Sequence, residues 1–177
     1  MERAEIQARI RSFAQRPNHR RVTALVVHCS ANIEGVDIGA KEIKDFHVHK
    51  RGWCDIGYHF VIRIDGTIEP GRDLNKAGAH VADHNSYTIG ICYVGGLINQ
   101  KNRRGHYISK DTRTPAQKDS LRWLLGELVD ALPIKSIKGH RDYSPDLNGN
   151  GVIEPSEYIK SCPCFDAEPE YRDLLEK

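Results

Sequence analysis

Apolar residues repeat along the chain with the periods of both helices and strands. Spacings of three and four residues predict amphipathic helices over residues 2–15, 38–51 and 115–132. Short apolar runs predict strands over residues 23–28, 87–94 and 136–140, and alternation around Asp65-Gly66 predicts a β-hairpin over residues 58–69. Residues 97–113 are polar and rich in Gly, Asn and Arg, which predicts a surface loop. Helices and strands alternate, so we expect an α/β fold with helices packed on a sheet.

Two of the helices carry recognisable start signals. The sequence Thr114-Pro115-Ala116-Gln117 is a capping box with proline at the first helical position. Asp37 is the expected N-cap of the helix over residues 38–51, and Gly52 is expected to end that helix.

The length of 177 residues is typical of one domain. The longest uninterrupted aliphatic stretch, residues 24–27, is far shorter than the ~20 residues that a membrane helix needs. The first 21 residues contain no apolar core of the signal-peptide type. We therefore expect no membrane span and synthesis in the cytoplasm without Sec export.

Charge is distributed unevenly between the N-terminus and the rest of the chain. Residues 1–21 hold six Arg and two Glu, whereas the remainder holds 20 basic and 22 acidic residues. We divide the chain into a basic amphipathic leader (residues 1–21) and one catalytic domain (residues 22–177), and we expect the leader to be dispensable for chemistry. A nucleic-acid-binding domain normally carries a basic face, so the near-neutral domain makes a nucleic-acid partner a weak hypothesis.

Candidate metal ligands stand at the ends of two predicted strands. His28 and His140 each end an apolar run, and Cys162 follows in a loop. Two imidazoles and one thiolate would give zinc three protein ligands and leave the fourth position for water, which is a catalytic arrangement. The alternative is that these residues are buried strand-end histidines and a core cysteine. His47 and His49 are expected on a solvated helix surface, and Cys29, Cys54 and Cys92 are expected to be small buried residues.

A series of short motifs surrounds these residues in a fixed order. The series is Val26-Val27-His28-Cys29-Ser30-Ala31, Trp53-Cys54-Asp55-Ile56-Gly57-Tyr58-His59-Phe60, Gly71-Arg72, Ala79-His80, Asn85-Ser86, Ile89-Gly90-Ile91, Gly139-His140 and Lys160-Ser161-Cys162-Pro163-Cys164-Phe165-Asp166. It resembles the zinc-dependent N-acetylmuramoyl-L-alanine amidases of the type 2 family, and among them the amidase-type phage lysozymes. More distantly it is similar to the peptidoglycan recognition proteins.

The resemblance, which covers about residues 23–166, implies a central mixed β-sheet flanked by helices. It implies zinc on His28, His140 and Cys162, with Tyr58 and Lys160 as catalytic residues. The substrate would be peptidoglycan, cut at the amide between N-acetylmuramic acid and L-alanine. His80 and Asn85 match substrate-groove positions of the family. We expect a monomer that acts on the cell wall after release.

The residues also bear on the competing function, a module that binds peptidoglycan without cutting it. Such modules typically lack the metal cysteine. The presence of Cys162 together with both histidines and Tyr58 therefore favours catalysis.

An insertion over residues 142–160 contains a calcium-loop pattern. Its residues 146–157 match the EF-hand consensus D-x-[DN]-x-[DN]-G-x₅-E without a gap. The candidate Ca²⁺ ligands are Asp146, Asn148, Asn150, the Val152 carbonyl and Glu157, with Glu154 direct or through water. Residues 140–145 cannot form an incoming helix, so we expect half an EF-hand, followed by a helix from Pro155 to Lys160. The alternative is a Gly- and Asn-rich surface turn.

Overall fold

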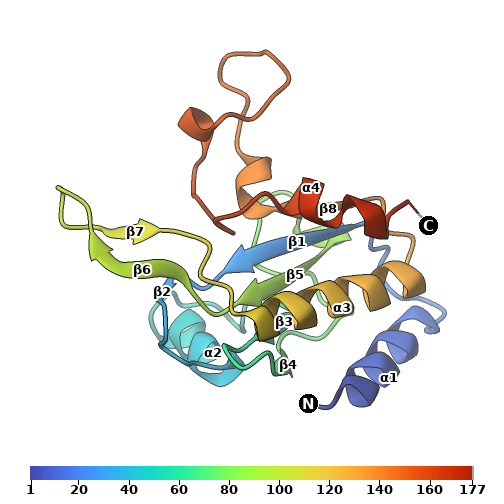
Figure 1. Ribbon diagram of the computed structural model, residues 1–177. Helices are drawn as coiled ribbons and strands as arrows, with labels where there is room; N and C mark the ends of the chain where they lie inside the picture. Colours follow the sequence, from blue (N-terminus) through green and yellow to red (C-terminus); the bar gives the residue numbers. More distant parts are fainter. Residues whose placement is uncertain (177) are drawn as a thin grey trace.

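A five-stranded mixed sheet forms the centre of the structure, a computed structural model that describes residues 1–176 (Figure 1). The strand order is β4-β3-β5-β1-β8. Its strands are β1 (Ala24–Cys29), β3 (Phe60–Ile62), β4 (Ile68–Pro70), β5 (Thr88–Tyr93) and β8 (Ser136–Gly139). Strands β3, β5, β1 and β8 run parallel to one another, and β4 pairs antiparallel with β3. The expected mixed sheet with flanking helices is thus confirmed.

Alternation along the buried strands separates two layers of packing. In β1, Leu25 and Val27 belong to the main core, and Val26 and His28 alternate with them. The main core is covered by α1 (Arg3–Ala14), α3 (Pro115–Ala131) and α4 (Ala167–Tyr171). On the other side Ile43 of α2 (Ala40–His49) packs in a smaller cluster with Val61 of β3. The sheet therefore presents His28 to the layer that contains α2.

The N-terminal helix is built into the main core. Ile6, Ile10 and Phe13 are at most 2% exposed and belong to the main core, where α1 contacts α3 and β4. Figure 1 shows α1 lying beside α3, and Gln7 of α1 donates a hydrogen bond to Glu127 of α3 at 2.9 Å. The amphipathic pattern is confirmed, and whether the segment is dispensable for hydrolysis stays a prediction.

The start of α3 follows its sequence signals, whereas the start of α2 does not. Thr114 accepts a hydrogen bond from the Gln117 amide at 3.1 Å, and the Gln117 side chain accepts one from the Thr114 amide at 3.0 Å. Gly39, not Asp37, precedes the first residue of α2. The Asp37 carboxylate instead pairs with Arg63. None of the described helices has the length and hydrophobicity of a membrane span.

The expected loop over residues 97–113 is wrong. Strands β6 (Gly96–Lys101) and β7 (Tyr107–Ser109) form a hairpin that joins β2 (Asn32–Ile33) in a second sheet. Figure 1 shows this hairpin extending away from the main sheet. Most of its side chains are exposed, so the pattern of polar and apolar residues carries no sign of a buried face.

The insertion is also less regular than expected. Residues His140–Tyr143 and Pro155–Glu157 form short 3₁₀ helices, and the backbone is extended at Tyr158. The predicted helix from Pro155 into Lys160 is therefore wrong. Three residues close only one turn, and the extended Tyr158 interrupts further helical hydrogen bonding. The expectation that residues 140–145 form no helix holds only for an α-helix, because His140–Tyr143 form a 3₁₀ helix.

Candidate active site

The three predicted ligands converge where two neighbouring strands end. His28 lies near the carboxyl end of β1, and His140 directly follows β8, which runs parallel to β1. Their rings are 4.8 Å apart. Cys162 completes the group, since one ligand atom from each of the three residues lies within 4.8 Å of the others. Parallel pairing of β1 with β8 thus brings together His28 and His140, which are 112 positions apart, and the later loop adds Cys162.

Backbone contacts hold the loop that carries Cys162 against the sheet. The Arg141 amide donates to the Cys162 carbonyl at 2.8 Å, and the Tyr93 hydroxyl donates to the Pro163 carbonyl at 2.7 Å. A side chain at Gly139 would collide with the Pro163 ring, so this glycine allows the close approach. The Cys29 amide donates to the Cys162 sulfur at 3.2 Å, which fixes the position of this sulfur at the end of β1.

Burial keeps the imidazoles of this site neutral. It lowers the pKa of His140 to about 4, with a further contribution from the charge of Lys160. The pKa of His28 is well below its usual range, first because the ring is buried and then because His80 and His140 lie near it. A neutral imidazole offers a nitrogen lone pair, which a metal ion requires.

A cavity of about 640 Å³ opens over these residues. His140, Lys160 and Cys162 are among the residues that line it. One wall comes from α2 and the segment after it, and the opposite wall comes from β1, β2, β6 and β7. Apolar side chains of these walls are Ile38, Ile43, Phe46, Trp53 and Leu97. The hairpin that was expected to be a loop therefore lines the cavity.

Tyr58 lies beside the candidate ligands. Its ring is 5.1 Å from that of His28, and burial raises the pKa of its hydroxyl well above 10. The hydroxyl therefore stays protonated at neutral pH and can donate a hydrogen bond. Arg72 positions this segment: its guanidinium donates to the Ile56 carbonyl at 2.7 Å and its amide to the Tyr58 carbonyl at 2.9 Å.

The two residues predicted to contact substrate have different surroundings. His80 lines the cavity but is only 8% exposed, and its Nδ1 lies 3.0 Å from Nε2 of His28. The Asn85 side chain accepts hydrogen bonds from the amides of His80 and Val81, at 2.9 and 3.1 Å. Asn85 thus shapes the segment that carries His80. A direct contact of either residue with substrate stays a prediction.

His47 is a candidate that sequence reasoning missed. It was expected on a solvated helix surface, but it is 7% exposed and lines the cavity. Its Nδ1 accepts a hydrogen bond from the Gly57 amide at 3.1 Å, and its ring lies 5.6 Å from that of Tyr58. Burial lowers its pKa to about 4. The available signal was position, since His47 follows Ile43 by four residues on the apolar face of α2.

The remaining cysteines do not belong to the ligand group. Cys92 and Cys29 are buried as expected, whereas Cys54 is exposed, so the prediction for Cys54 is wrong. Cys54 lies in the segment between α2 and β3, outside both core clusters. Cys164 directs its sulfur to the Gly96 carbonyl at 3.4 Å and lies 3.8 Å from the Cys29 sulfur.

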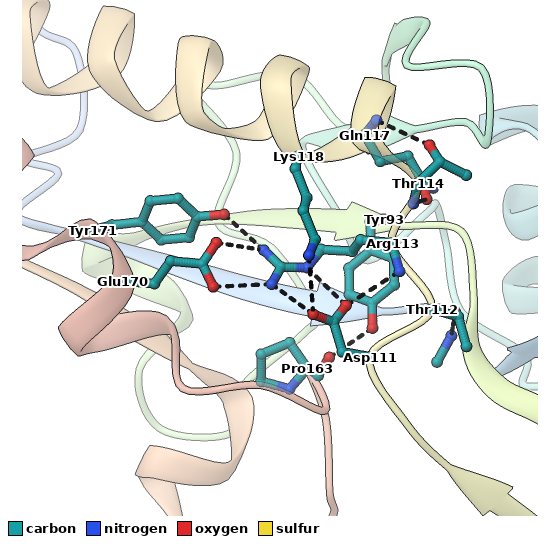
Figure 2. Close-up of polar contacts among 11 residues, drawn as sticks. Tyr93, Asp111, Thr112, Arg113, Thr114, Gln117, Lys118, Pro163, Glu170 and Tyr171 are labelled. Carbon is teal, nitrogen blue, oxygen red and sulfur yellow. Dashed lines mark hydrogen bonds and ion pairs between the residues drawn. The ribbon is translucent and has the colours of Figure 1, made fainter.

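A buried arginine secures the C-terminal segment just beyond Cys162. Figure 2 shows the Arg113 guanidinium between Asp111 and Glu170, with paired hydrogen bonds of 2.8 to 2.9 Å to each carboxylate. The same group donates to the Tyr171 hydroxyl at 2.8 Å and stacks 3.2 Å above the Phe165 ring centre. These contacts tie α4 and Phe165 to the segment that precedes α3.

The chemistry of the donor set fits a zinc ion. Two neutral imidazoles and a thiolate are soft to borderline ligands, in the numbers found at catalytic zinc sites. The alternative of a core cysteine with buried histidines does not explain why all three ligand atoms face one another beside a cavity.

Comparison with known proteins agrees with this geometry. Residues 18–163 match the family described as N-acetylmuramoyl-L-alanine amidase. The endolysin of Enterobacteria phage K11 is 38% identical over 142 residues, which are 80% of each chain. The peptidoglycan-recognition protein SC1a of Drosophila melanogaster is 33% identical over 107 residues, 59% of this chain and 52% of that one.

Among solved structures, the N-acetylmuramoyl-L-alanine amidase LysC of Clostridium intestinale superposes with a TM-score of 0.64 at 25% identity. The match covers 93% of this chain and 92% of that one. The fold, the family match and the endolysin relatives agree on one assignment. The chain belongs to the N-acetylmuramoyl-L-alanine amidase family, enzymes that hydrolyse the amide joining N-acetylmuramic acid to L-alanine in peptidoglycan.

Proposed function

We propose that this amidase is zinc-dependent and that His28, His140 and Cys162 hold the ion. The observation that carries the proposal is the convergence of their three ligand atoms within 4.8 Å, beside the cavity. Bound there, zinc would lower the pKa of a water molecule toward ~7 and polarise the scissile carbonyl.

Tyr58 and Lys160 supply the remaining groups of the proposed mechanism. Lys160 lines the cavity, and its ammonium can stabilise the negative charge that develops on the amide oxygen. The protonated hydroxyl of Tyr58 can orient the attacking water or the tetrahedral intermediate by a hydrogen bond. A proton must also reach the leaving alanine amine, and we assign Tyr58 a part in moving it.

The cavity between α2 and the β6–β7 hairpin is the proposed groove for the muramyl peptide. Its apolar wall can pack against the lactyl and alanyl methyl groups, and its polar rim can bind the amides and sugar hydroxyls. We propose that the enzyme acts as a monomer on the cell wall after release from the cytoplasm. The relatives that are endolysins support this site of action.

Digestion of purified peptidoglycan tests this proposal directly. The zinc-loaded enzyme should release new N-terminal alanine without new reducing sugar, and Cys162→Ser should release none. Binding to peptidoglycan without any release would instead favour the non-catalytic module.

We propose in addition that residues 146–157 bind Ca²⁺ in a structural role. The side-chain oxygens of Asp146, Asn148 and Asn150 accept hydrogen bonds from backbone amides of the loop. Glu157 is buried, and its carboxylate accepts hydrogen bonds from the amides of Leu147 and Asn148. The Val152 carbonyl would be the main-chain ligand, and Glu154 would bind directly or through water. With few charged ligands the dissociation constant should lie near 10⁻⁶ to 10⁻³ M.

Thermal melting of the zinc-loaded protein tests the calcium proposal. Millimolar Ca²⁺ should raise the unfolding midpoint of the wild type and leave that of Glu157→Gln unchanged. Equal midpoints with and without Ca²⁺ in the wild type would show that the segment is only a turn.

A further inference from the structure

A chain of hydrogen bonds leads from His28 through His80 to Thr88 at the start of β5. Nε2 of His28 lies 3.0 Å from Nδ1 of His80, and both rings are buried. Nε2 of His80 lies 3.4 Å from the hydroxyl of Thr88. The Thr88 hydroxyl donates to the carbonyl of His84 at 2.9 Å. None of these contacts is required by the mechanism above.

The carbonyl at the end of this chain fixes the direction of every hydrogen bond in it. A carbonyl oxygen only accepts, so the single proton of the Thr88 hydroxyl is used there. Thr88 must then accept from His80, which places the proton of the neutral His80 ring on Nε2. Nδ1 of His80 consequently accepts from Nε2–H of His28.

The consequence for His28 is a defined tautomer. With its proton on Nε2, the neutral ring has a free lone pair on Nδ1. That atom lies 3.7 Å from the Cys162 sulfur, on the side where the ligand atoms meet. The hydrogen-bond chain therefore presents the correct nitrogen to a metal ion and fixes the plane of the ring.

The surroundings of His80 are shaped for an imidazole in this position. A side chain at Gly78 or Gly90 would collide with the His80 ring, so both glycines are needed for it to fit. Thr88 and Gly90 lie two residues apart on β5 and so face the same side of the sheet. Asn85 holds the backbone at His80 through its two accepted hydrogen bonds.

We infer that His80 is a positioning residue for the metal ligand His28, with Thr88 fixing the tautomer of His80. The inference rests on the proposed zinc function. It assigns His80 a role that acts through His28, whereas the sequence-based expectation was contact with substrate. Such outer partners of metal-binding histidines typically change metal affinity or activity 10–100-fold.

Zinc affinity measured without substrate separates the two roles. We compare wild type, His80→Leu and His80→Asn by competition with a chromophoric chelator. His80→Leu removes the acceptor and should weaken zinc binding by about 10–100-fold. His80→Asn places an amide oxygen near the position of Nδ1 and should restore most of the affinity. If His80 only contacts substrate, His80→Leu would raise KM and leave zinc affinity unchanged. That result would overturn the inference.

The ring proton of His28 provides a second readout, which needs neither zinc nor activity. In metal-free, ¹⁵N-histidine-labelled protein, the Nε2–H resonance of His28 should be protected from exchange in wild type and His80→Asn, and lost in His80→Leu. If His80→Leu does not fold, Thr88→Val replaces it and should weaken zinc binding in the same direction. Wild-type affinity in Thr88→Val would then overturn the inference. Failure of the wild type to bind zinc would instead refute the proposed function.

Discussion

Two cysteines separated by one residue have different surroundings, and the difference predicts which one binds metal. The Cys162 sulfur accepts a hydrogen bond from the Cys29 amide and is one of the three candidate ligand atoms. The hydrogen bond with Cys29, together with burial, raises the pKa of Cys164 far above its usual range, so this sulfur stays a thiol. We expect Cys162→Ser to weaken zinc binding by more than about 100-fold, because a ligand should contribute more than its outer partners do.

Cys164→Ser is the matched control for this substitution. It should retain zinc at the wild-type stoichiometry, measured by metal analysis after dialysis. Loss of zinc in Cys164→Ser but not in Cys162→Ser would reverse the assignment of the ligand.

Lys160 and Tyr58 should matter for rate and not for metal binding. The ammonium of Lys160 acts on charge that develops only during the reaction, and loss of such a donor costs about 10²–10³ in rate. We expect Lys160→Ala and Tyr58→Phe to bind zinc normally and to lose about this much in kcat. Lys135, an exposed lysine that does not line the cavity, provides the control Lys135→Ala. Wild-type turnover of Lys160→Ala on soluble muropeptides would place the oxyanion donor elsewhere.

At the scale of elements, even a conservative replacement of Arg113 should lower the stability of the protein. Arg113 is 1% exposed in its side chain and binds two carboxylates with paired hydrogen bonds, which a single ammonium cannot reproduce. Breaking a buried pair typically costs about 3–5 kcal/mol. We therefore expect Arg113→Lys to lower the free energy of unfolding by about 3 kcal/mol in urea titrations.

The surface pair between Arg122 and Asp173 is the control for this prediction. Both side chains are about half exposed, so Arg122→Lys should change the free energy of unfolding by less than about 1 kcal/mol. Equal effects of the two substitutions would show that burial adds nothing to the Arg113 contacts.

Elements with local signals were predictable, and those that depend on distant contacts were not. The start of α3 was readable because its capping residues are adjacent in sequence. The β6–β7 hairpin was missed because its exposed faces leave no alternation of burial. The candidate ligands were found from strand ends and family resemblance, but the hydrogen bond between His28 and His80 joins residues 52 positions apart. Only the folded sheet shows which partner His80 has.

At the scale of the whole molecule, several neutral histidines are built into the interior, and this predicts acid sensitivity. Burial lowers the pKa of His59 to about 3 and that of His47 to about 4. The unfolded chain binds protons at these residues below about pH 6.5, whereas the folded chain does not. Stability is thus complete above pH 6.5 and falls as the pH drops from 6.5 toward the folded pKa values.

Between pH 6.5 and pH 5 each of these two residues should cost about 2 kcal/mol of folding free energy. For a chain of this size the two together correspond to a fall of about 10 °C in the unfolding midpoint. Calorimetry of the metal-free protein between pH 7.5 and pH 5 measures this fall in the unfolding midpoint. The asparagine of His59→Asn can still accept a hydrogen bond from the Gly90 amide but does not titrate. The unfolding midpoint of this variant should therefore change less with pH than that of the wild type. A wild-type midpoint that stays constant down to pH 5 would mean that these histidines accept protons without unfolding the chain.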